Sequence, residues 1–152
     1  ITLVQTPLHL RTVGDAMRGS FPSWSAALRE LGPGGWITQN MDPDEPRTAW
    51  ERAQWDRCDT DALCGLADAT PGVDVTGYVA RIGVPVLVLA PAASHLTPLA
   101  DQWFLRTTIP DAEIEVFEGR GHNLYIEEPA RCIARVREFT RRRGPTASGG
   151  TG

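Results

Sequence analysis

Residues 84–90 constrain the fold of this 152-residue chain more than any other segment. They read VPVLVLA, so a strand formed here would be apolar on both faces. Such strands lie in parallel sheets that helices cover on each side. Pro85 fits at the start of the strand, where a missing backbone donor is tolerated. The segment therefore predicts a buried strand of a parallel sheet.

Two further strand-like runs, residues 1–4 and 113–117, alternate with helical patterns over about 98–109 and 128–142. Thr97 is the expected N-cap of the first of these helices. Strands alternating with helices predict right-handed crossovers and a parallel sheet, which makes the fold class α/β. A sheet of three strands leaves an apolar edge that must pair with something. We therefore expect more of the sheet to come from elsewhere.

The sequence divides into a sheet core, residues 1–12 and 82–143, and a helical insertion, residues 13–81. Within the insertion we expect helices over 24–31, 46–57 and 60–69, and irregular structure over 11–21. Residues 144–152 are rich in Gly, Ser and Thr and predict a disordered tail. The insertion holds four tryptophans, which form either its own core or the lining of a substrate pocket: Trp24, Trp36, Trp50 and Trp55.

Composition excludes several classes of function. The net charge is −4, which argues against a nucleic-acid-binding domain. Three cysteines without a C-x-x-C motif indicate neither a disulfide framework nor a zinc site, and Cys132 is expected to be a buried thiol. No apolar run approaches the length of a membrane span, and no signal peptide is evident, so we expect a cytoplasmic protein. The absence of an initiator Met before Ile1 indicates a piece of a longer protein.

His122 is the strongest catalytic candidate. It follows the strand-like run 113–117 on a glycine-rich turn, EGRGH, and precedes a helix. A histidine placed just beyond a strand end can be aimed at a substrate, and imidazole is suited to general base catalysis. The alternative is a structural histidine of the turn. His95 is either an exposed loop residue or part of a pocket.

From about residue 25 to 139 the chain resembles the C-terminal half of an α/β-hydrolase. Three stretches carry the resemblance: 84–98, like the strand and loop that deliver the catalytic acid; 109–113, which lead into the last strand; and 119–129, like the catalytic-histidine turn with its closing helix. Residues 26–36 are similar to the cap of 3-oxoadipate enol-lactonase-like members.

The resemblance implies a serine nucleophile on a strained turn, an oxyanion hole of backbone N–H groups, and the chain order serine, acid, histidine. The histidine corresponds to His122. The sequence contains no G-x-S-x-G motif, so the nucleophile is expected before Ile1, in an N-terminal half that is an upstream segment or a separate chain.

The catalytic acid departs from the family pattern. Related loops read roughly G-x-x-D-x-x-x-P, whereas residues 91–98 read PAASHLTP and place Ser94 at the position of the acid. Disabling the acid in such a triad can cost about four orders of magnitude in rate. A serine hydroxyl can hold a tautomer but adds no negative charge. Either the acid has moved, to Asp101 or to the missing half, or the enzyme uses a weaker Ser–His pair, or hydrolysis has been lost.

The leading expectation is therefore an enzyme that acts on an ester, lactone or related carbonyl compound, with His122 as its base. Trp24, Trp36 and His95 are the candidates for the substrate pocket. No motif indicates a metal or an organic cofactor. The alternatives are a non-hydrolytic homologue, such as a cyclase, isomerase or ligand-binding protein, and a docking fragment that only completes a partner's sheet.

Overall fold

The computed structural model describes residues 1–4 and 6–143, so the predicted tail over 144–152 lies outside the described residues. The chain forms two compact units: Ile1–Leu8 with Val75–Gly152, called the sheet unit below, and His9–Asp74, called the helical unit. The sequence analysis placed the corresponding boundaries after residues 12 and 81. Val79 precedes the boundary expected after residue 81, yet it packs in the core of the sheet unit, which resumes at Val75.

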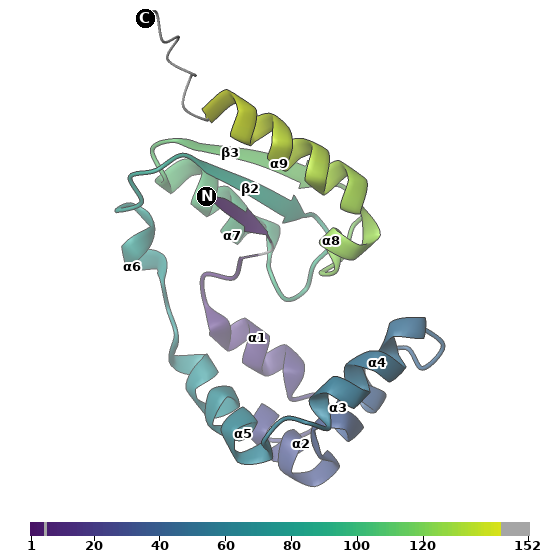
Figure 1. Ribbon diagram of the computed structural model, residues 1–152. Helices are drawn as coiled ribbons and strands as arrows, with labels where there is room; N and C mark the ends of the chain where they lie inside the picture. The colour runs from purple at the N-terminus through teal and green to yellow at the C-terminus, as the bar shows by residue number, and fades with distance from the viewer. Residues whose placement is uncertain (5, 144–152) are drawn as a thin grey trace, which may run out of the picture. The chain divides into compact units, whose positions relative to one another are not determined.

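The described part of the sheet unit contains a parallel sheet of three strands in the order β1-β2-β3 (Figure 1). These strands are β1, Thr2–Val4; β2, Val86–Pro91; and β3, Ala112–Phe117. In the register, Val88 lies opposite Leu3 on one side and Ile114 on the other. Every residue of β2 is buried, which confirms the prediction from its two apolar faces.

Helices cover both faces of this sheet (Figure 1). On one face, Val86, Val88 and Ala90 pack with residues of α6, Thr76–Val79, and α7, Leu99–Thr108. On the other face, Leu87, Leu89 and Phe117 pack with residues of α8, Leu124–Glu127, and α9, Pro129–Arg143. Cys132 lies in this second cluster as a buried free thiol, as predicted. Burying one such Leu, Val or Phe side chain contributes about 1.5–3 kcal/mol.

The outer face of β3 carries an ion network with α9. Arg131 donates to Glu115 (2.8 Å), Arg135 pairs with Glu115 (3.0 Å), and both Arg135 and Arg142 reach Glu113. The side chain of Arg135 is only 14% exposed, because β3 presents two carboxylates to that face of α9.

The helical unit contains α1, Leu10–Met17; α2, Trp24–Leu31; α3, Pro33–Asn40; α4, Pro46–Trp55; α5, Thr60–Ala69; and the 3-10 helix η1, Thr70–Gly72. The predictions for α2 and α5 are confirmed to the residue. The predicted irregular segment 11–21 is wrong, because most of it forms α1. Gly14 is buried in α1, and a Cβ there would lie 3.4 Å from Pro71 Cγ, so this helical glycine packs closely against Pro71.

The segment 32–35 ends α2 and begins α3, whereas the sequence analysis predicted no helix between residues 31 and 46. Gly32 adopts a left-handed φ of 71° between α2 and α3. Pro33 then occupies the first turn of α3, where its missing N–H needs no partner.

Three of the four tryptophans of the helical unit pack together. The ring of Trp36 lies 5.2 Å from that of Trp55 and 5.9 Å from that of Trp24, and its indole N–H donates to the Met17 carbonyl at 2.9 Å. Trp36 is 5% exposed, whereas Trp50 is largely exposed. Trp36 is therefore a core residue of this unit. Among the described helices, none has the length and apolarity that crossing a membrane requires.

Candidate active site

The carboxyl ends of β2 and β3 bring two loops together. Because the strands are parallel neighbours, both loops leave the same edge of the sheet. Backbone hydrogen bonds tie the loops to each other: Ala92 N–H donates to the Phe117 carbonyl at 3.1 Å, and Ala93 N–H to the Arg120 carbonyl at 2.9 Å. Gly119, with a φ of 67°, supplies the left-handed residue of the second loop. Residues 28 positions apart in the sequence therefore become neighbours.

Ser94 and His122 meet at this edge. The Ser94 Oγ lies 3.4 Å from His122 Nδ1. Ser94 also accepts two hydrogen bonds from Thr97, one from its backbone N–H at 3.1 Å and one from its hydroxyl at 2.9 Å. Ser94 is 9% exposed and Thr97 is fully buried. We call these three residues the loop site.

The position of Thr97 differs from the prediction. The residue at the N-cap of α7 is Pro98, and no side chain caps this helix. The Thr97 hydroxyl bonds to Ser94 instead, so a residue that the sequence analysis assigned to helix capping belongs to the loop site. The sequence signal for the contact between Thr97 and Ser94 was a serine followed three residues later by a threonine. This spacing is also common in ordinary turns.

The environment of His122 favours its neutral form. His122 is partly buried, and this burial lowers the pKa of its imidazole. The positive charge of nearby His95 lowers the pKa of His122 further. Both effects disfavour a cation. His95 itself is exposed on the loop after β2.

Asp101, the alternative acid, lies in the first turn of α7, where its backbone N–H donates to the Pro98 carbonyl at 3.0 Å. Within residues 1–4 and 6–143, no hydrogen bond or ion pair joins a carboxylate to His122. In the described chain, the group beside Nδ1 is therefore the hydroxyl of Ser94.

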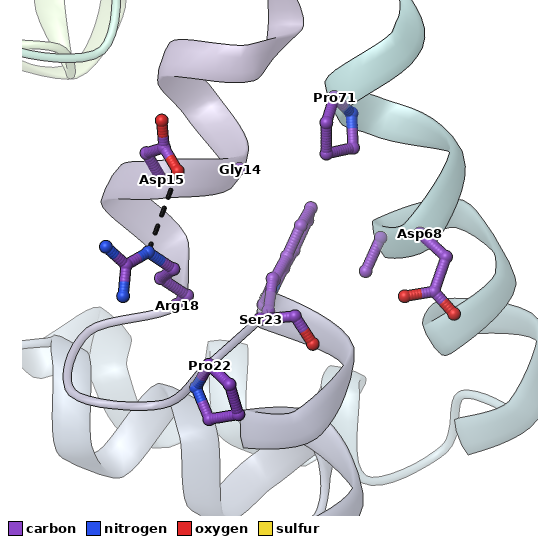
Figure 2. Close-up of a pocket in the computed structure, with 9 residues that line it drawn as sticks. Gly14, Asp15, Arg18, Pro22, Ser23, Asp68 and Pro71 are labelled. Atoms are coloured by element: carbon purple, nitrogen blue, oxygen red, sulfur yellow. Dashed lines mark ion pairs between the residues drawn. The ribbon is translucent and has the colours of Figure 1, made fainter.

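Of the two tryptophans expected at a substrate pocket, Trp24 lines a pocket within the helical unit. This pocket, shown in Figure 2, has a volume of about 140 Å³. It is lined by residues of α1, α2, α5 and η1 and of the segment that joins α1 to α2: Gly14, Asp15, Arg18, Pro22, Ser23, Trp24, Ala67, Asp68 and Pro71. Asp15 and Arg18 pair across 3.6 Å at its side. The buried indole nitrogen of Trp24 has no hydrogen-bond partner among the described residues.

Comparison with known proteins identifies the fold. No family model and no curated protein matches the chain. Among solved structures, a hydrolase from Oleispira antarctica superposes with a TM-score of 0.71 at 17% identity, covering 93% of this chain and 55% of that one. An α/β-hydrolase enzyme from a Medee basin deep-sea metagenome library gives a TM-score of 0.68 at 19% identity, covering 92% and 55%. The fold is that of an α/β-hydrolase.

A third structure gives the same result. MenH from S. aureus superposes with a TM-score of 0.70 at 16% identity, covering 93% of this chain and 59% of that one. The chain thus spans somewhat more than half the length of these three structures. The predicted fold class is confirmed: parallel strands, flanking helices and a helical insertion, as in the C-terminal half of this fold.

Proposed function

We propose that this chain is the histidine-bearing part of an α/β-hydrolase-type enzyme that acts on an ester, a lactone or a related carbonyl compound. The observation that carries the proposal is the contact between Ser94 and His122 at the carboxyl edge of a parallel sheet. In open α/β sheets, ligands bind outside this edge. The esterases and hydrolases among the structural matches support the same class of chemistry.

In the proposed reaction, an N-terminal half of the fold supplies the serine nucleophile and the oxyanion hole. His122 Nε2 accepts the serine proton as the hydroxyl attacks the carbonyl carbon, and the imidazolium then returns that proton to the leaving group. In the second step His122 takes a proton from water as the water oxygen attacks the acyl carbonyl carbon. The bond between the acyl group and the serine oxygen then breaks, His122 returns the proton to that oxygen, and the acyl group is released as the acid. The imidazolium has no carboxylate beside it in the described chain, so this base is weaker than one in a complete triad.

The test is ester hydrolysis by the chain joined to its upstream sequence, with and without His122→Ala. Loss of a general base lowers kcat/KM by about 10²–10⁴-fold. His9→Ala is a matched control, since His9 is an exposed histidine of the helical unit, and it should leave the rate unchanged. Equal rates for His122→Ala and the parent protein would reject the proposed role.

A second candidate function rests on Ser94 itself. A site without the acid fits a non-hydrolytic homologue, in which the same edge of the sheet serves a cyclisation, an isomerisation or ligand binding. Ser94→Asp separates the two functions, because a carboxylate beside Nδ1 completes a hydrolytic triad. A large gain in esterase rate indicates a weakened hydrolase, and no gain favours the non-hydrolytic function.

A further inference from the structure

The hydrogen bonds of the Ser94 hydroxyl define which way its proton points. A hydroxyl has one proton to donate and two lone pairs that accept. In Ser94 both acceptor positions are used by Thr97, through its backbone N–H and its hydroxyl. Among the described residues, the other polar atom that contacts the Ser94 Oγ is His122 Nδ1 at 3.4 Å. The Ser94 proton is therefore the one that lies between the two residues.

The reverse arrangement leaves a buried proton without a partner. If Nδ1–H donated to Ser94, the Ser94 hydroxyl would have to turn toward Thr97 and donate to its Oγ1. The Thr97 hydroxyl would then need another acceptor, and none accepts from it in the described part of the chain. Thr97 is 0% exposed, so water does not replace that acceptor. An unsatisfied buried hydroxyl costs about 1–3 kcal/mol.

We infer that neutral His122 carries its proton on Nε2, and that the Thr97–Ser94 pair sets this tautomer by donating to Nδ1. This is the opposite of what a catalytic carboxylate does. A carboxylate only accepts, so it holds the proton on Nδ1 and leaves the Nε2 lone pair free to act as a base. In this chain the ring instead presents an N–H donor on its Nε2 side, and Thr97 is a positioning residue that acts through Ser94.

The tautomer adds to the proposed function a statement of which ring nitrogen of His122 carries the proton. Its effect on catalysis, described next, rests on the proposed function. An Nε2–H group of a neutral ring donates to a carbonyl oxygen or to a developing oxyanion, and so polarises a substrate carbonyl. Removal of a serine proton requires the other, minority tautomer. We therefore expect hydrolysis by the parent protein to be slow, and carbonyl polarisation to be the chemistry for which the resting site is arranged.

The direct test is nitrogen-15 NMR of the histidine rings in the full chain, at about pH 8, where an ordinary histidine is neutral. The His122 signals are assigned by their loss in His122→Gln. We expect a protonated, pyrrole-type Nε2 and an unprotonated, pyridine-type Nδ1. A protonated Nδ1 in the parent chain would overturn the inference without any further variant.

Two substitutions test what sets the tautomer. Thr97→Val removes the hydroxyl donor, retains the N–H, and frees a lone pair on Ser94, so the Nδ1–H fraction should rise. Ser94→Asp should place the proton on Nδ1. Thr70→Val is the control, because Thr70 is a buried threonine of the helical unit that donates to the Leu66 carbonyl. An unchanged His122 spectrum in folded Thr97→Val would contradict the role of Thr97.

The two proposals can fail separately. If Nδ1 is protonated while His122→Ala abolishes hydrolysis, the tautomer inference is wrong and the proposed function stands. If Nε2 is protonated while His122→Ala leaves hydrolysis unchanged, the tautomer inference stands and the proposed base is wrong.

Discussion

Two polar clusters of the sheet unit provide their partly buried polar groups with partners in different ways. The loop site joins Ser94, Thr97 and His122 by hydrogen bonds without a carboxylate. The ion network between β3 and α9 pairs carboxylates, chiefly Glu113 and Glu115, with several guanidinium groups. Carboxylates next to cations are thus used to fasten a helix to the outer strand, while the group that faces the histidine is a neutral hydroxyl.

The contrast predicts that the two clusters respond to different perturbations. The stability that a network of charges contributes depends on every charged partner and on pH. A neutral site depends on which hydrogen bonds can be donated and accepted. Three experiments, from the largest expected effect to the smallest, separate these behaviours.

Arg135→Met should give the largest loss of stability. The substitution keeps the aliphatic stem but removes the guanidinium from Glu113 and Glu115, which lie 24% and 23% exposed. Loss of hydrogen bonds to charged groups costs about 1.5–3 kcal/mol, and part of this is recovered here because water reaches both carboxylates. Urea denaturation of the full chain measures the change.

Arg137→Met is the control for this experiment. Arg137 lies two residues along the same helix and is exposed, so its replacement should change the free energy of unfolding by less than about 0.5 kcal/mol. Equal losses in the two variants would show that the network contributes nothing beyond the helix itself.

Acid should weaken the ion network through Glu113. Burial by itself raises the pKa of Glu113, but hydrogen bonds from Arg135, Arg143 and Arg142 outweigh it, so the pKa of Glu113 is lowered overall. A carboxyl with a depressed folded pKa stabilises the folded state above its unfolded pKa. This contribution is lost as the pH falls through the folded pKa.

The measurement is the free energy of unfolding against pH from neutral into the acid range, for the parent chain and for Glu113→Gln. The glutamine variant should be less stable at neutral pH and should show a shallower fall in acid. Parallel curves for the two proteins would mean that Glu113 does not contribute to the acid sensitivity.

His95→Gln should have the smallest effect, confined to the loop site. Burial is the larger cause of the lowered pKa of His122, and the charge of His95 is the second. Removing that charge should raise the pKa of His122 part of the way toward its ordinary value. An NMR titration of the His122 ring measures this shift, and a fall in the pKa would contradict the assigned repulsion.

Much of the fold follows from local sequence. The apolar run of β2 predicts a central parallel strand, and α2 and α5 have the predicted bounds 24–31 and 60–69. Several helices were not predicted. Two of them, α1 and α3, contain Gly14 and the segment 32–35, which resemble helix breakers, and α6 and α8 are four-residue helices of about one turn. Gly14 proves to be a packing position against Pro71, and Gly32 and Pro33 join two helices without a gap. In both places a tertiary contact or a single left-handed residue outweighs helix propensity.

The sequence likewise identified some residues of the candidate site and missed another. The strand, turn and helix around residue 122 identified the histidine, and the loop pattern identified Ser94 as the residue in the place of the acid. The part played by Thr97 was not visible, since a threonine before a proline is equally suited to a helix start.

The amino-acid sequence by itself determined three features: the order of strands and helices, the apolar faces of the sheet, and the imidazole just beyond a strand end. Each depends on residues within a few positions of one another. The direction of the Ser94 proton was decided by the tertiary structure alone. It depends on how many donors converge on one buried oxygen, and those donors meet only after β2 and β3 have paired and drawn their loops together.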